Sequence, residues 1–205
     1  MNMQENMEKR SYQGGETRVG ADAMVVEGYA AVFNSWSNDL GGFVERIDPS
    51  AFEGVIGKRD VRALVDHDWS KLLARESAGT LELSVDERGL KYKIDLPETS
   101  LGRDLNVLIA RGDIQENSFA FTVGEDKWTE RQDGTYERTI TKVEDLFEVS
   151  IVSLPAYNDA KIAQRTLENI KEETAAQLEA AKKETEERKV MLDEYSNFIN
   201  TLKEI

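Results

Sequence analysis

The chain changes character after Pro155, and this change constrains its fold more than any other feature of the sequence. No glycine or proline follows Pro155, although these two residues interrupt helices most often. Glu179 and Lys183 lie four positions apart, where opposite charges stabilise a helix. Apolar residues recur in a loose stripe that thins in its middle: Leu167, Ile170, Leu178, Ala181, Met191, Tyr195, Phe198 and Leu202. The sequence therefore predicts a long amphipathic helix or coiled-coil arm over residues 162–205.

The preceding residues, 21–161, alternate short apolar runs with turn residues, as is typical of a β domain. Strands are expected at 24–33, 43–47, 61–65, 80–85, 90–96, 117–123, 139–143 and 146–153, with a hairpin over 128–136. Two short helices are expected between them, one starting at Asp48-Pro49 and one capped by Ser100 and ending at Gly112. Strands at this spacing predict a mainly β member of the α+β class, built as a closed or nearly closed antiparallel β-barrel. Residues 1–20 show no periodicity and are predicted to be flexible.

Composition restricts the chemistry that the chain can perform. Its formal net charge of -14 repels phosphate backbones, so nucleic-acid binding is disfavoured. The chain has no cysteine, which excludes disulfides, thiolate catalysis and cysteine zinc sites. With one histidine, His67, and no EF-hand spacing, the sequence predicts neither a metal nor a cofactor. No run approaches the about 20 consecutive apolar residues that span a membrane.

Three residues are candidates for catalysis, although each has a plain structural interpretation when taken alone. His67 lies between Asp66 and Asp68 at the end of a strand, and such a histidine is usually a surface residue. Ser118 lies in a strand, where a serine is ordinarily structural, and it lacks the Gly-x-Ser-x-Gly context of an α/β-hydrolase. Glu148 interrupts an apolar strand, so it either has a buried partner or lies on an edge that faces water.

Together, His67, Ser118 and Glu148 satisfy the requirements of a hydroxyl nucleophile. Such a nucleophile needs a base to accept its proton, and the base needs an acceptor that fixes its tautomer. The order in this chain is His67, then Ser118, then Glu148. It differs from the order in the chymotrypsin, subtilisin and α/β-hydrolase arrangements.

Four motifs in sequence order resemble those of the tailed-bacteriophage prohead (capsid maturation) serine proteases, which are related to the herpesvirus assembly proteases. They are EGYAAVFN at 27–34 with ERIDPSAF at 45–52, LVDHD at 64–68, NSFAF at 117–121, and LFEVSIVSLPAY at 146–157. The resemblance covers about residues 25–161. It implies a barrel of antiparallel strands with surrounding helices, like that of the herpesvirus proteases.

The resemblance also implies serine endopeptidase activity inside the assembling procapsid, in the host cytoplasm. The implied substrates are the scaffold and the major capsid protein, and also the protease itself. By this resemblance His67 is the general base and Ser118 the nucleophile. Glu148 occupies the position where herpesvirus proteases carry a second histidine, and Asp145 and the two acids beside His67 compete for the third role.

The sequence departs from the herpesvirus pattern at the end of the motif over residues 146–157. Those proteases have a paired-arginine loop that serves the oxyanion, whereas this chain has Pro155-Ala156-Tyr157. Backbone N–H groups near Phe119 or Ala156 are therefore candidate oxyanion donors, as are the side chains of Arg103 and Arg111.

A second hypothesis places the function of the chain in the arm rather than in the barrel. Here the chain is a non-catalytic, scaffold-like assembly factor that acts through residues 162–205. The arm is expected to pair with helical scaffold or with a second copy of the chain, and the alternative is a helix that folds back on its own barrel. The connection over residues 160–166 is expected to be exposed and accessible to self-cleavage.

Overall fold

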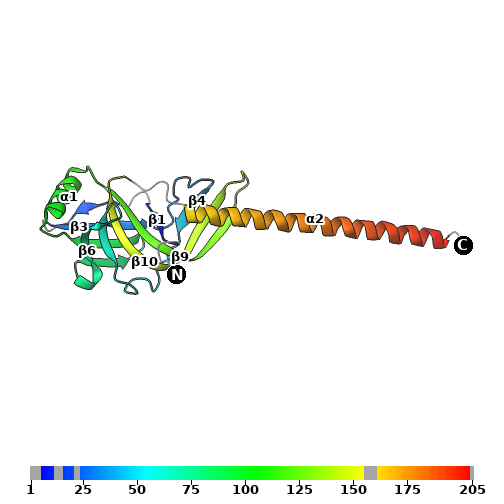
Figure 1. Cartoon of the computed structure of the whole chain (residues 1–205), viewed down its shortest axis with the longest axis horizontal. Coiled ribbons are helices and arrows are strands. Elements are labelled where there is room, and N and C mark those ends of the chain that lie inside the picture. The colour runs from blue at the N-terminus through cyan, green and yellow to red at the C-terminus, as the bar shows by residue number, and fades with distance from the viewer. Residues whose placement is uncertain (1–5, 12–15, 21–23, 155–160, 204–205) are drawn as a thin grey trace. The chain divides into compact units, whose positions relative to one another are not determined.

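The computed structural model describes residues 6–11, 16–20, 24–154 and 161–203 (Figure 1). The chain divides into two compact units, Met1–Ile162 and Ala163–Ile205. The first unit is mainly β, and the second consists of most of the long helix α2 (Lys161–Lys203). No described helix is both long enough and apolar enough to cross a membrane.

The described strands form two sheets. The larger one contains, in order of pairing, β1 (Glu8–Arg10), β9 (Glu116–Glu130), β10 (Tyr136–Val152), β5 (Arg62–Val65) and β6 (Asp68–Arg75), and β4 (Phe43–Ile47) also pairs with β10. The smaller one contains β2 (Arg18–Val19), β3 (Val25–Val32), β8 (Gly89–Asp95) and β7 (Leu81–Val85). A short 3-10 helix, η1 (Glu76–Ala78), precedes β7, and helix α1 (Ser100–Arg111) precedes β9.

Strand β10 organises the larger sheet. It pairs antiparallel with β9 along its length, while its first part pairs with β4 and its last part with β5, both in parallel. Ser150 lies opposite Ser118, and Glu148 lies opposite Ala120 on β9 and beside Arg62 on β5. The register therefore brings the motif around Ser118, the part of β10 around Glu148 and the strand before His67 to one end of the sheet.

Both sheets contribute to one apolar core. Phe119 and Phe121 of β9 stack with their ring centroids 4.7 Å apart, and Phe119 also packs against Phe52 at 5.9 Å. Tyr92 and Ile94 of β8 are buried in the same cluster. Every residue of β9 from Asn117 to Phe121 is buried, so both faces of this strand are covered at the serine motif.

The prediction of a mainly β fold with a long C-terminal helix is confirmed. A single closed antiparallel barrel is not confirmed, because the described strands form two sheets and β10 has parallel neighbours. β4 and β5 both run in the same direction as β10. The residues between β4 and β5 form turns, so the chain does not reverse there as it would in a hairpin.

The helix expected from Asp48 is wrong. Successive turns replace it, with N–H groups bonded three residues back, as from Ala51 to the Asp48 carbonyl at 2.9 Å. Gly54 and Gly57 adopt φ of 70° and 79°, a left-handed conformation that ends a right-handed helix. The apolar residues expected to point inward are nevertheless buried: Ala51, Phe52 and Val55.

Two other expectations differ from the structure in detail. Helix α1 is capped by Thr99 rather than Ser100, since the Thr99 side chain accepts a hydrogen bond from the Gly102 N–H at 3.2 Å. Within the range expected to be flexible, residues 8–10 and 18–19 form β1 and β2. β1 is ordered because Glu8 and Arg10 find oppositely charged partners that lie far away in the sequence.

Candidate active site

His67 occupies a two-residue turn between β5 and β6, where Val65 pairs with Asp68. Asp66 and His67 adopt φ of 51° and 58°, the left-handed conformation that a type I′ hairpin requires at both positions. Residues with a Cβ atom resist this conformation by about 1–2 kcal/mol each. Strain of this kind persists only where the surrounding contacts impose it, as they often do at functional sites.

Hydrogen bonds from β10 and the residue that follows it impose the turn. The Asp66 carboxylate accepts from the Ser153 backbone N–H at 2.8 Å and from its hydroxyl at 2.9 Å. The backbone N–H of His67 donates to the Ser150 hydroxyl oxygen at 3.2 Å. The turn is thus fixed against the end of β10, and the imidazole ring is directed at that strand.

The His67 ring is bonded to Glu148. Its Nδ1 lies 2.6 Å from Glu148 Oε1, and the Glu148 side chain is only 2% exposed. The other carboxylate oxygen, Oε2, accepts from the Ser150 hydroxyl at 2.5 Å. The buried carboxylate is therefore satisfied on both oxygens, and the interpretation of Glu148 as an edge residue facing water is wrong.

The second ring nitrogen of His67 is available. Nε2 is buried and has no hydrogen-bond partner within the described part of the chain. With the Nδ1 proton directed at the Glu148 carboxylate, Nε2 carries the lone pair that can accept a proton. A buried nitrogen without a partner costs stability, so its position favours a role in which a partner arrives later.

Ser118 lies on the adjacent strand, next to this pair but not bonded to it in the residues described. It is the register partner of Ser150, which places the two side chains on one face with Cβ atoms about 4.5–5.5 Å apart. Ser118 is fully buried, and its hydroxyl donates to the Arg10 carbonyl oxygen at 2.9 Å. The structure thus joins His67 to Glu148 directly and brings Ser118 close through Ser150.

The acids that compete with Glu148 have other partners. Asp145 accepts from Arg59 at 2.6 Å and 3.1 Å, and this guanidinium holds the pKa of Asp145 below its ordinary value. Asp66 is engaged by the residue after β10, and Asp68 accepts from the Ser70 hydroxyl at 2.6 Å. Of the four carboxylates considered, the one that reaches the imidazole is Glu148.

The candidate oxyanion donors lie in different parts of the chain. Arg103 of α1 donates to the Glu98 carbonyl at 2.6 Å, and Arg111 pairs with Asp113 at 3.0 Å. Phe119 follows Ser118 directly on β9, whereas Ala156 lies outside the described residues. Both arginines are thus used in local contacts of α1 and the segments that flank it.

Ser150 contacts the candidate pair but was not among the residues predicted from the sequence, although the sequence contained a signal for it. It follows Glu148 by two positions on the same strand, and such residues share a face. Its hydroxyl contacts both the carboxylate and the backbone of His67.

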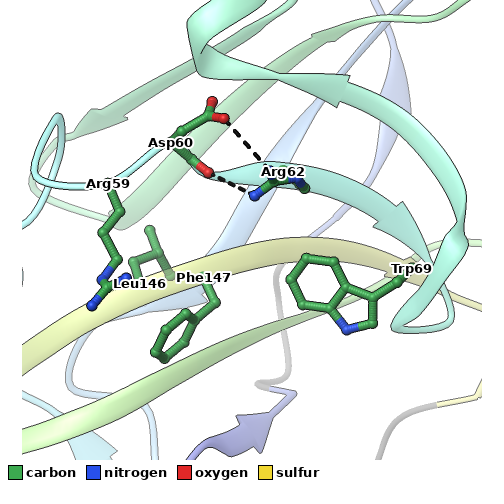
Figure 2. Close-up of a pocket in the computed structure, with 6 residues that line it drawn as sticks. All are labelled: Arg59, Asp60, Arg62, Trp69, Leu146 and Phe147. Carbon is green, nitrogen blue, oxygen red and sulfur yellow. Dashed lines mark hydrogen bonds and ion pairs between the residues drawn. The ribbon is translucent and has the colours of Figure 1, made fainter. Parts of the chain in front are cut away.

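A pocket of about 220 Å³ lies on the β5, β6 and β10 side of the site. Figure 2 shows its lining, in which the rings of Phe147 and Trp69 lie near the guanidinium groups of Arg59 and Arg62. Arg62 is the register partner of Glu148, and Phe147 precedes Glu148 on β10, so the pocket is lined by residues next to the histidine–carboxylate pair in the sheet. Aromatic walls with a basic rim could hold a side chain of a bound peptide.

A buried histidine–carboxylate pair beside a buried serine is the arrangement found in serine hydrolases. A comparison of the sequence with known protein families shows which family of serine hydrolases the chain belongs to. The family model described as caudovirus prohead serine protease matches residues 9–173, and the chain belongs to this family. Membership implies a serine peptidase of capsid maturation, and it confirms the resemblance seen in the four motifs. No curated protein and no solved structure matches the chain.

Proposed function

We propose that this chain is a serine endopeptidase that cleaves scaffold and major capsid protein segments, and itself, inside the procapsid in the host cytoplasm. The observation that carries the proposal is the bond between buried Glu148 and His67, whose Nε2 has no partner among the described residues, together with the pairing of Ser118 with Ser150 on the neighbouring strand. The family supports the same class of reaction. The proposal includes the finer fold, in which the two sheets correspond to parts of a barrel like that of the herpesvirus assembly proteases.

In the proposed mechanism, Ser118 is the nucleophile and His67 is the base. The Ser118 proton moves to His67 Nε2 while Oγ bonds to the carbonyl carbon of the scissile peptide. Glu148 holds the ring in the required tautomer and stabilises the imidazolium, which then protonates the leaving amine. Water cleaves the acyl-enzyme by the same steps, with His67 again as base. The Ser118 hydroxyl must first leave the Arg10 carbonyl.

A phosphonylating probe tests the proposal. The purified full-length chain is expected to gain one adduct, located on Ser118, and to shorten its cognate capsid protein in a time course followed by intact mass. The same preparation carrying Ser118→Ala should do neither. A wild-type chain that stays unlabelled, leaves capsid protein whole and still supports assembly would establish the non-catalytic assembly factor instead.

Ser150 is a positioning residue in this scheme, and Ser150→Ala is expected to reduce turnover. The substitution removes the hydrogen bonds that orient Glu148 and the His67 backbone. Hydrogen bonds to charged groups contribute about 1.5–3 kcal/mol, which corresponds to a fall in kcat of about tenfold to a hundredfold. Steady-state kinetics on a capsid-derived peptide provide the measurement.

Two comparisons make the Ser150 result specific. Ser150→Thr retains a hydroxyl and should restore most of the activity. Ser70→Ala serves as the matched control, because it removes a serine–carboxylate bond to exposed Asp68 and should leave turnover near wild type. Equal kcat for Ser150→Ala and wild type would show that Ser150 does not orient the pair.

A further inference from the structure

Strand β1 lies along β9 and ends beside Ser118. The pairing is antiparallel, with Glu8 opposite Phe121 and Arg10 opposite Phe119. The chain leaves the sheet after Arg10, at the point where its carbonyl oxygen accepts a hydrogen bond from the Ser118 hydroxyl at 2.9 Å. The Arg10–Ser11 peptide bond therefore lies against the proposed nucleophile.

This placement has the features of a bound peptide. An extended segment that adds to a sheet gains affinity from main-chain hydrogen bonds and specificity from pockets for alternate side chains. Glu8 and Arg10 point to one side of β1 and are each only 2% exposed, while Lys9 between them is half-buried. The two side chains on one side of the strand, those of Glu8 and Arg10, are thus enclosed.

The enclosing groups are charged and complementary to β1. Arg10 Nε donates to Glu45 Oε1 at 2.9 Å, and the Glu45 side chain is fully buried. Arg138 donates two hydrogen bonds to the Glu8 carboxylate, at 3.0 Å and 3.1 Å. Arg10 and Glu8 also bond to each other. The body therefore supplies one carboxylate for a basic side chain and one guanidinium for an acidic side chain two positions earlier.

Both of these recognising groups also have a charged partner outside β1. Arg138 also donates to Glu45 at 2.7 Å and to Asp126 at 2.7 Å. Burial lowers the pKa of Arg138, but the carboxylates of Glu45 and Glu8 outweigh this effect and raise it above its ordinary value. If β1 departed, Glu45, Arg138 and Asp126 would remain mutually paired, so no isolated charge would be left in the interior.

We propose that β1 is a substrate-like strand of the enzyme itself and that the Arg10–Ser11 bond is a self-cleavage site. Glu45 and Arg138 then select extended segments that carry an acidic residue two positions before a basic residue at the scissile bond. This inference rests on the proposed function. It also means that β1 blocks the β9 edge against other substrates until residues 1–10 are released.

The step conserves atoms and charge. The Ser118 hydroxyl rotates from the Arg10 oxygen toward His67, gives its proton to Nε2, and bonds to the Arg10 carbonyl carbon. The bond from that carbon to the Ser11 nitrogen breaks, and the nitrogen takes the proton from His67 as it leaves. One water then hydrolyses the ester, which releases the Arg10 carboxylate and restores Ser118.

The self-cleavage test uses the full-length chain. Intact mass and N-terminal sequencing are expected to show wild-type protein that begins at Ser11, and Ser118→Ala protein that keeps residues 1–10. Arg10→Ala should stop this cut, whereas Arg10→Lys should restore it, because an ammonium can still pair with Glu45. Lys9→Ala is the matched control, since its side chain alternates away from Glu45 and Arg138, and it should still be cut after Arg10.

The selectivity test uses a synthetic peptide with the sequence of residues 6–14 and the shortened enzyme. Glu8→Gln and Arg10→Ala in the peptide should each reduce kcat/KM by about tenfold or more, since each removes a charge-assisted contact. Lys9→Ala in the peptide should change it little. Equal cleavage of all four peptides would overturn the assignment of Glu45 and Arg138.

The two proposals fail in different ways. A preparation that labels at Ser118 and cuts capsid protein while residues 1–11 stay intact would overturn self-cleavage at Arg10 and leave the proposed function standing. A preparation that neither labels nor cuts any substrate would remove the proposed function itself. Cleavage that is confined to other parts of the chain would also overturn the assignment of the Arg10–Ser11 bond.

Discussion

Ser118→Ala and His67→Ala are each expected to lower the rate of capsid-protein cleavage by about 10⁶-fold, down to the residual level that binding alone provides. The two residues act as a unit, because the hydroxyl has no base without His67 and the base has no nucleophile without Ser118. The double variant should therefore be no slower than either single variant. Single-turnover rates, followed by intact mass, give the comparison.

Both variants are expected to remain folded. Ser118→Ala forfeits one hydrogen bond to the Arg10 carbonyl, a loss of about 1 kcal/mol. Circular dichroism and thermal unfolding would establish that the sheet is retained. Cleavage within a few-fold of wild type by folded Ser118→Ala protein would remove this serine from the mechanism, and the nucleophile would have to be sought elsewhere.

Local patterns in the sequence identified the parts of the site that a single strand can specify. Alternation in β9 placed Ser118 and Ala120 on one face and Phe119 and Phe121 on the other, and both phenylalanines are core residues. The carboxylate inside the apolar run around Glu148 signalled a buried partner, which is His67. These features depend on neighbours in the sequence, where strand periodicity is strict.

Features that depend on distant partners could not be predicted in the same way. Glu8 and Arg10 belong to a segment that the sequence predicts to be flexible, and they are ordered and buried because Glu45 and Arg138 pair with them. β10 was expected as two separate strands, but bulges such as the register shift between Val143 and Asp145 let the pairing with β9 continue.

Two further misses have local causes that the patterns obscured. β6 was not predicted because its sequence, DWSKLLAR, shows no alternation of apolar and polar side chains, and half of its residues are exposed. The capping signal at Asp48 was real, since its side chain accepts from the Ser50 N–H at 2.9 Å. That cap begins a turn instead of a helix, because two glycines in left-handed conformation follow within nine residues.

The third member of the proposed catalytic set yields the second large effect. Glu148→Gln is expected to reduce kcat by about 10⁴-fold, as does the loss of the equivalent carboxylate in other triads. A glutamine occupies nearly the same volume, but it is neutral and cannot stabilise the imidazolium that forms when Nε2 takes the proton. It also no longer enforces the tautomer that leaves Nε2 free.

Asp145→Asn is the matched control, because it makes the same change from carboxylate to amide on the same strand. Asp145 is bonded to exposed Arg59 and does not contact the imidazole, so its loss removes a surface pair of about 0–1 kcal/mol and should leave kcat near wild type. A reversed ranking, with Asp145→Asn slow and Glu148→Gln fast, would assign the third role to Asp145. Two slow variants that are both unfolded would be recognised by thermal unfolding, and Glu148→Asp would then report whether a carboxylate at this position restores turnover. Charge rather than shape sets the expected difference, because His67 needs a negative group beside it when it becomes positive, and Glu148 is the carboxylate bonded to its ring.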